Sequence, residues 1–371
     1  MRILFISTHL YPCAIGGVEL FNFHLIQALG QDHQVSVLTA CEADFKNPHV
    51  KLIKVNPQIC VFQKPSLFFE HVRNIFSLRK EINLIHVPYT SRSWLHGIYL
   101  PVFRRLFGIP YVLVLHGGGM IPWRPRLPHW LLFREAEEII AISRPIQEEY
   151  EKRSGRKIRV IPPRLPFEAA RRSKSDLRKA YGYREEDQVI MTLGSIKKIK
   201  GSDLLLQAFF GLGPELIEKR RARLLVVGNG PMREALEVDV KQRRFDRWVR
   251  FLGNVPHDQV PEMYRLADIY VIPSLMEGAP LSLMEAMFNG LSIVGSDIES
   301  IRLFIQDGQN GLLFKKGEIR GLEEKLRALL SNQGLGEKLG RSARLTHDSA
   351  LCFKDVVDAH LRLYEKIART H

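Results

Sequence analysis

The feature that most constrains this fold is an alternation of short β-branched and aliphatic runs with longer stretches of helical periodicity, which occurs twice along 371 residues. Such alternation is typical of parallel sheets joined by crossover helices. The sequence therefore predicts an α/β chain with two Rossmann-like domains in tandem. Strands are expected at 2–7, 34–39, 52–55, 84–87, 111–116, 139–143 and 158–161, and then at 189–193, 223–227, 249–252, 269–273, 292–295 and 311–314.

A break between the two series follows from prolines. Pro162, Pro163 and Pro166 precede the basic stretch 171–174, and proline prevents a regular element from continuing. We expect a first domain over 1–165, a linker over 166–185, a second domain over 186–350 and a C-terminal helical segment over 351–371. Because open parallel sheets bind ligands outside the carboxyl ends of their strands, a substrate is expected in a central cleft that the two domains face.

Composition narrows the class of protein. With 45% hydrophobic and 25% charged residues, the chain is expected to be soluble and globular. No apolar run of about 18 residues is free of charges or breakers. The start, MRILFISTHLYP, has one charge and an apolar core too short for a signal peptide, so the cytoplasm is the expected location. The four cysteines, Cys13, Cys41, Cys60 and Cys352, have no metal-ligand spacing and are expected to be reduced thiols.

The net charge of +14 indicates an anionic partner. A nucleotide, a nucleic acid and an acidic membrane surface all meet that requirement. The charge is spread over both halves of the chain and forms no compact basic stripe. No recognised nucleic-acid motif is present, so a nucleic-acid partner is not expected.

The most informative segment is 271–297, where strand, glycine-containing loop, helix and strand follow one another. Glu277 lies in the loop and Glu285 in the helix, and the alternative is that both are ordinary structural glutamates. The first amides of the helix are expected to be free donors that could bind a phosphate. The two carboxylates could then reach hydroxyl groups of the same ligand, one on each side of the phosphate. A nucleotide sugar has this layout of hexose, diphosphate and ribose. The residues expected to surround such a donor here are Gly278, Ala279, Pro280, Leu281 and Ser282.

The segment EGAPLSLMEAM, with Glu277 and Glu285 eight residues apart, resembles the E-x7-E motif of retaining GT-B glycosyltransferases. The resemblance (glycosyltransferase family 4, glycosyl transferases group 1) covers nearly the whole chain. Further motifs match in order and spacing: GGVE, VLVLHGGG, IAISRP, LGSIKKIKGSDLLLQAF, VVGNGP, FLGNVPHDQVPEMYRLADIYVIPS and DGQNGLLF. The resemblance implies a GT-B fold with two domains facing a cleft, and a last helix that crosses back to the first domain.

The resemblance also implies roles for individual residues. Lys200 would pair with the donor diphosphate, Glu277 would bind the transferred sugar, Glu285 would bind the ribose and His116 would contact the sugar near its reacting carbon. A lysine aimed at the leaving phosphate would lower the barrier to departure. Lys200 could also be an ordinary solvated lysine and His116 a structural histidine.

The loop that contains Gly16 and Gly17 follows the first strand, and the resemblance places it facing the donor. The two glycines could also simply form a turn. The chain departs from the family pattern at Ser195, where an arginine is usual, so one diphosphate cation is missing. Lys197 or Lys198 could replace it, or donor affinity could be reduced.

No Asp-x-Asp triplet and no P-loop motif occur, so we expect no metal and no cofactor beyond the donor substrate. The segment 120–133 mixes aromatic and basic residues. It suits contact with the inner face of a membrane or packing on the sheet, and both interpretations stay open. Gly228-x-Gly230 is too weak a pattern to indicate a dinucleotide site.

Taken together, these features predict a retaining, metal-independent enzyme. It would move a hexose from a UDP-, GDP- or ADP-linked donor to a glycan or lipid-linked acceptor. A nucleotide-sugar epimerase or hydrolase on the same fold is the alternative, and a non-enzymatic nucleic-acid-binding protein is a further one.

Overall fold

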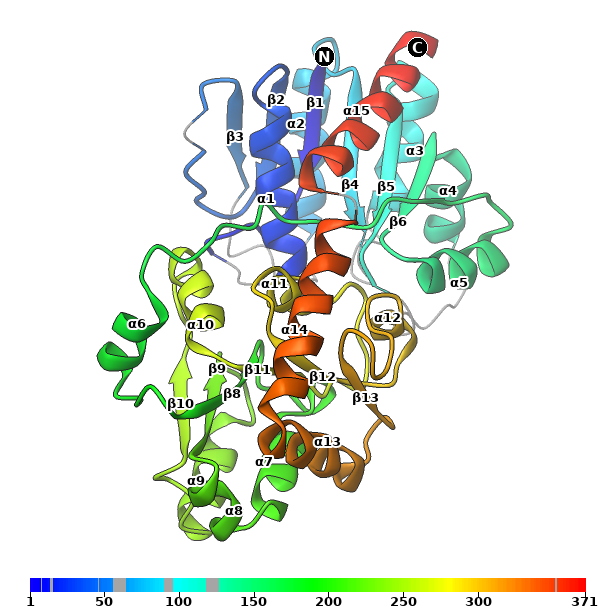
Figure 1. The fold of residues 1–371 in the computed structure, drawn as a ribbon. Helices are drawn as coiled ribbons and strands as arrows, with labels where there is room; N and C mark the ends of the chain where they lie inside the picture. The colour runs from blue at the N-terminus through cyan, green and yellow to red at the C-terminus, as the bar shows by residue number, and fades with distance from the viewer. Residues whose placement is uncertain are drawn as a thin grey trace. The chain divides into compact units, whose positions relative to one another are not determined.

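The computed structural model describes residues 1–7, 9–13, 16–45, 47–55, 65–89, 96–117, 127–350 and 352–371, with the side chains of 65–68 and 127 left out. The chain divides into two compact units. Unit 1 comprises Met1–Pro166 together with Leu351–His371, and unit 2 comprises Phe167–Ala350. Each unit is built on its own parallel sheet (Figure 1).

Unit 1 contains a seven-stranded parallel sheet in the order β3-β2-β1-β4-β5-β6-β7. The central strands β4 and β5 are buried along their whole length, because helices cover both faces. The strands are β1 Arg2–Ile6, β2 Gln34–Thr39, β3 Val50–Lys54, β4 Leu84–Tyr89, β5 Tyr111–Leu115, β6 Glu138–Ala141 and β7 Arg159–Val160.

The helices of unit 1 are α1 Gly17–Leu29, α2 Pro65–Leu78, α3 His96–Phe107, α4 Leu127–Glu135, α5 Arg144–Ser154 and α15 Phe353–Thr370. The last helix, α15, contacts α1 and β4 and lies across the front of the sheet in Figure 1. Its apolar residues recur at helical spacing and bury Val356, Leu363 and Ile367. At the centre of this contact Tyr364 is hydrogen bonded to His86 of β4.

Unit 2 contains a six-stranded parallel sheet in the order β10-β9-β8-β11-β12-β13. Its strands are β8 Gln188–Leu193, β9 Ala222–Val227, β10 Val249–Gly253, β11 Ile269–Ile272, β12 Ser292–Ser296 and β13 Leu312–Phe314. Its helices are α6 Lys174–Tyr181, α7 Ser202–Gly211, α8 Pro214–Lys219, α9 Arg233–Gln242, α10 Val260–Leu266, α11 Leu281–Phe288, α12 Glu299–Arg302, α13 Ile319–Ser331 and α14 Gln333–Asp348, with single 3-10 turns η3 Lys198–Lys200 and η4 His257–Gln259.

The α/β class and the two tandem parallel sheets predicted from the sequence are confirmed. The structure differs over 166–185, where a linker is expected. Helix α6 lies there and belongs to unit 2. The Ser173 side chain caps its first turn, and Lys174 and Arg178 both form ion pairs with Asp268. The prolines therefore end the first sheet, and a regular element begins soon after them.

Candidate functional site

The best-defined polar cluster in unit 2 joins Glu277 to Lys200. The Lys200 ammonium donates to both carboxylate oxygens of Glu277, at 2.7 and 2.8 Å, and the Ser274 hydroxyl donates to Oε1 at 2.7 Å. Only 9% of the Glu277 side chain is exposed, against 35% for Lys200. The carboxylate is thus held in place, while the ammonium keeps access to solvent and to an anionic ligand.

The chain brings these two loops together through a glycine. Gly201 follows η3 with a φ of 71°, and a Cβ at this position would lie 2.1 Å from the carbonyl oxygen of Pro273. Only glycine permits so close an approach. The amide of Leu275 also donates to the Ile199 carbonyl at 2.8 Å. The loop after β8 and the loop after β11 are therefore locked side by side at the carboxyl edge of the sheet.

Glu285 lies on α11, eight residues beyond Glu277, and is held by a different partner. The Tyr264 hydroxyl donates to its Oε2 at 2.8 Å, and burial raises the pKa of this carboxyl to about 7. Burial raises the pKa of Tyr270, on β11, and the charges of Glu277 and Glu285 raise it further. Near neutral pH Glu285 therefore exchanges between a neutral and a charged form, and the charged form can accept hydrogen bonds from hydroxyl groups.

The loop 278–280 connects Glu277 to α11, and one expectation about it needs correction. The Leu281 amide is not a free donor, because it donates to the Ala279 carbonyl at 3.0 Å. Pro280 cannot donate, and its carbonyl accepts from Leu283 at 3.0 Å. The Ser282 carbonyl lies 3.0 Å from the same Tyr264 hydroxyl, whose single proton it shares with Glu285, and this contact ties the first turn of α11 to α10. The helix start therefore offers fewer amides to an anion than the sequence suggests.

The basic loop after β8 contains Lys197 and Lys198, the two lysines that could replace the missing arginine. Lys198 forms an ion pair with Asp203 of α7, and the side chains of both Lys197 and Lys198 are exposed. Gly228 and Gly230 pack against this same loop, since a Cβ on either would lie 1.9 or 2.4 Å from the carbonyl oxygens of Gly194 and Ile196. The two glycines thus have a packing role, which agrees with setting aside a dinucleotide site.

The other candidate residues belong to unit 1. His116 directly follows β5, is almost fully buried, and its pKa is lowered to about 3 by burial and by the nearby His360. Its imidazole is therefore neutral near pH 7, so it can act as a hydrogen-bonding group but not as a cation. Gly16 is the N-cap of α1 in an extended conformation, and Gly17 is the first residue of the helix. Their neighbours 14–15 and 118–119 lie outside the described residues.

The remaining expectations concern the segment 120–133, a metal site and a membrane span. Residues 120–126, half of the aromatic and basic segment 120–133, lie outside the described residues, and α4 begins at Leu127. Within the described part of the chain, no three His, Cys, Asp or Glu side chains gather in a way that could hold a metal ion. Among the same residues, no helix is both long enough and apolar enough to span a membrane.

Three residues of this site were missed by sequence reasoning, namely Tyr264, Tyr270 and Ser274. All three lie in the segment PEMYRLADIYVIPS, which the family motif includes without marking them. The sequence did contain a signal for the two tyrosines, since both have apolar sequence neighbours. A tyrosine in an apolar stretch is expected to be buried, and a buried hydroxyl needs a polar partner. Nothing local identifies Glu285 as that partner of Tyr264, since 21 residues separate the two.

The raised pKa of Glu285 predicts a pH-dependent stability. The folded pKa of about 7 exceeds the ordinary 4.5, so this group's contribution is fully present below pH 4.5 and is lost as the pH rises to about 7. We expect about 1 to 3 kcal/mol of unfolding free energy to be lost over that window. Glu285→Gln, which cannot ionise, should remove this slope in unfolding curves recorded from pH 5 to pH 8. Equal slopes in the two proteins would contradict the assignment.

The fold and the site together define the architecture of a GT-B glycosyltransferase. Residues 173–346 match the family described as Glycosyl transferases group 1, and residues 15–164 match Glycosyltransferase Family 4. The chain belongs to these glycosyltransferases and is an enzyme of the transferase class. This favours transfer over the epimerase, hydrolase and nucleic-acid-binding alternatives.

Individual relatives resemble the chain over its length. It is 25% identical over 379 residues to N-acetyl-alpha-D-glucosaminyl L-malate synthase of Bacillus anthracis, an alignment that covers 97% of this chain and 96% of the relative. HepE of Anabaena, solved in complex with UDP-glucose, has a TM-score of 0.81 at 19% identity and covers 99% and 100% of the two chains. Sucrose-phosphate synthase of Thermosynechococcus elongatus has a TM-score of 0.80 at 20% identity with full coverage of both.

Proposed function

We propose that this glycosyltransferase retains the anomeric configuration and moves a hexose from a nucleoside diphosphate sugar to a glycan or lipid-linked acceptor, without a metal ion. The observation that carries the proposal is the Lys200–Glu277 ion pair at the carboxyl edge of the unit 2 sheet, together with the partly buried Glu285 on the helix that follows. A cation for phosphate and two carboxylates for hydroxyl groups match the chemistry of such a donor. That HepE was solved with UDP-glucose supports this class of donor.

Each group has a task in this account. As the bond between the anomeric carbon and the phosphate oxygen breaks, negative charge grows on the diphosphate, and the Lys200 ammonium stabilises it. Glu277 accepts hydrogen bonds from the sugar hydroxyls and Glu285 from the ribose. His116, being neutral, hydrogen-bonds the sugar near the reacting carbon. The glycine pair at 16–17 allows the backbone of unit 1 to approach the donor closely.

Product analysis tests this function. The enzyme is incubated with UDP-, GDP- and ADP-linked hexoses and candidate acceptors, and the products are examined by NMR. We expect a glycoside whose anomeric configuration matches that of the donor. Free sugar as the main product even when acceptor is present, an epimerised donor, or an inverted glycoside would each overturn the proposal.

The proposed chemistry needs no divalent cation, because Lys200 supplies positive charge at the phosphate. Transfer by the purified enzyme should therefore be unchanged by EDTA. The measurement is the initial rate with and without the chelator, followed by addition of Mg²⁺. Complete loss of activity that Mg²⁺ restores would contradict this prediction.

The missing arginine gives a gain-of-function prediction. The Lys198 ammonium is already committed to Asp203, so one diphosphate position is expected to be weakly neutralised. Ser195→Arg should tighten nucleotide binding by about tenfold, the value of one charge-assisted hydrogen bond. Calorimetric titration with the donor nucleotide at fixed salt measures it. If Lys197 already fills the place, Ser195→Arg will be neutral or harmful and Lys197→Ala will weaken binding as much as Lys200→Ala.

A further inference from the structure

Two cysteines lie in neighbouring loops of unit 1. Strands β1 and β2 pair in parallel, with Ile6 opposite Leu38, so both strands end at the carboxyl edge of the sheet. Cys13 lies in the turn 11–13 that follows β1, and Cys41 comes shortly after the end of β2. The parallel pairing of the two strands therefore brings together two thiols that are distant in the sequence.

Hydrogen bonds connect the two loops on both sides of this pair. The Leu10 amide donates to Sγ of Cys41 at 3.5 Å, and the Cys13 thiol donates to the carbonyl of Glu42 at 3.4 Å. The thiols of Cys13 and Cys41 are also hydrogen bonded to each other. The Cys41 amide donates to the Thr39 hydroxyl at 3.1 Å, which holds the loop after β2 in place. The two sulfur atoms are thus neighbours in the folded chain.

The two thiols differ in their surroundings. Cys13 is exposed, whereas Cys41 is only 5% exposed. Burial, together with the hydrogen bond from Cys13, raises the pKa of the Cys41 thiol to about 11. Because reaction with an oxidant requires access and a thiolate, an oxidant in solution reacts with Cys13 first. Cys41 is placed to react with whatever becomes bound to its neighbour.

We propose that Cys13 and Cys41 form a redox pair, which a low-molecular-weight disulfide such as oxidised glutathione converts into an intramolecular disulfide. The Cys13 thiolate attacks one sulfur of the oxidant and releases a first thiol. The Cys41 thiolate then attacks the Cys13 sulfur and releases a second one. The protein thiols lose two electrons, which reduce the oxidant to two thiols that carry the two protons. An excess of a thiol reductant reverses both steps.

The bond would restrain the segment between β1 and α1. A cross-link lowers the conformational freedom of the chain it closes. Gly16, the N-cap of α1, follows Cys13 closely in the sequence. If the proposed function holds, the restrained segment is the one that leads to the glycine pair at the donor. The redox chemistry itself does not depend on that function, and its readout is the bond.

Peptide mapping by mass spectrometry tests the proposal. The full chain is incubated with oxidised glutathione, free thiols are alkylated, and the chain is digested. No lysine or arginine lies between positions 3 and 45, so trypsin leaves both cysteines in one peptide. A second protease that cleaves after Glu19 separates them. We expect the two fragments to stay joined until a reductant is added. A bond from either cysteine to another cysteine of the chain, or no bond, would overturn the proposal.

Cysteine variants separate the two steps. Cys41→Ser should stop at the mixed disulfide with glutathione on Cys13, and Cys13→Ser should form no intramolecular bond. Cys352→Ser is the matched control, because Cys352 is also an exposed thiol of unit 1 and its loss should leave the bond intact. Thermal unfolding checks that each variant folds. Since Cys13 is exposed, Cys13→Ser keeps the test decisive even where Cys41→Ser is unstable. Loss of the bond in Cys352→Ser would contradict the pairing.

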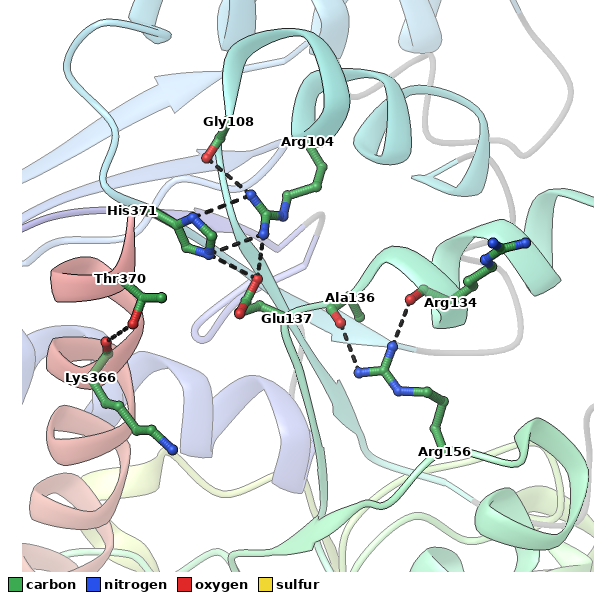
Figure 2. A network of polar contacts seen from close by, with 9 residues as sticks. All are labelled: Arg104, Gly108, Arg134, Ala136, Glu137, Arg156, Lys366, Thr370 and His371. Atoms are coloured by element: carbon green, nitrogen blue, oxygen red, sulfur yellow. Dashed lines mark hydrogen bonds and ion pairs between the residues drawn. The ribbon is translucent and has the colours of Figure 1, made fainter.

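Hydrogen exchange locates the effect of the bond. Amides in the segment 9–13 should exchange more slowly in the oxidised chain than in the reduced one, because the cross-link restrains local opening. The amino edge of the same sheet is the internal control. There Arg104 donates to Glu137, and Arg156 donates to two backbone carbonyls, as Figure 2 shows. Exchange around this network should not change. Equal changes at the two edges, or none in 9–13 once the bond has formed, would contradict the proposed restraint.

Discussion

Glu277→Gln should lower kcat/KM for sugar transfer by at least about a hundredfold, the usual cost of removing one preorganised polar group from a transition state. The substitution keeps the shape of the side chain and an oxygen that can accept from Ser274. It removes the charge that pairs with Lys200 at 2.7 Å. Steady-state kinetics with the acceptor identified by product analysis, or slow hydrolysis of the donor, measures the loss.

The neighbouring ion pair of the same loop provides the control. Asp203→Asn removes a carboxylate that pairs with Lys198 but is not proposed to touch the sugar. It should leave kcat/KM within about twofold of the wild type, as expected of a surface ion pair. Near-normal transfer by Glu277→Gln, or equal losses in the two variants, would show that Glu277 only stabilises the loop.

Lys200→Ala should weaken donor nucleotide binding by about ten- to a hundredfold, the value of a charge-assisted hydrogen bond of about 1.5 to 3 kcal/mol. The ammonium is the cation that the structure holds against Glu277, and 35% of the Lys200 side chain remains exposed. The loss should appear in both the dissociation constant of the nucleoside diphosphate and the KM of the sugar donor. Calorimetric titration at fixed ionic strength measures the first of these directly.

Lys198→Ala serves as the matched comparison, two residues away in the same turn. Its ammonium pairs with Asp203, so its removal should change nucleotide affinity by no more than about twofold. If both lysine variants bind the nucleotide like the wild type, the diphosphate does not lie beside this loop. If Lys198→Ala has the larger effect, the assignment of the two lysines is reversed.

Much of the fold could be predicted because local patterns determine it. Strands such as β5 and β9 are short apolar runs. The helical stretches between such runs indicate that the strands pair in parallel. Helix α6 was missed because the prolines before it and its charged sequence concealed a regular element. It is held by the Ser173 cap and by contacts with Asp268, about 90 residues away, and such contacts leave no local signal.

The candidate site could be predicted in its residues but not in its pairing. The motif identifies Lys200 and Glu277 separately, yet their ion pair depends on Gly201 packing against Pro273, which is a tertiary contact. The role of Tyr264 in holding Glu285 is hidden for the same reason. The prediction of a free amide at Leu281 was wrong, because in the turn at Pro280 this amide donates to the Ala279 carbonyl.

The central claim is that unit 2 binds a nucleoside diphosphate sugar through Lys200, and a thermal-shift panel tests it most directly. Wild-type chain and Lys200→Ala are heated with UDP-, GDP- and ADP-linked hexoses. Because a ligand that binds the folded state raises the melting temperature by mass action, we predict that donors of one base stabilise the wild type. The same donors should stabilise Lys200→Ala much less. No stabilisation by any donor at millimolar concentration, or equal stabilisation of both proteins, would contradict the claim.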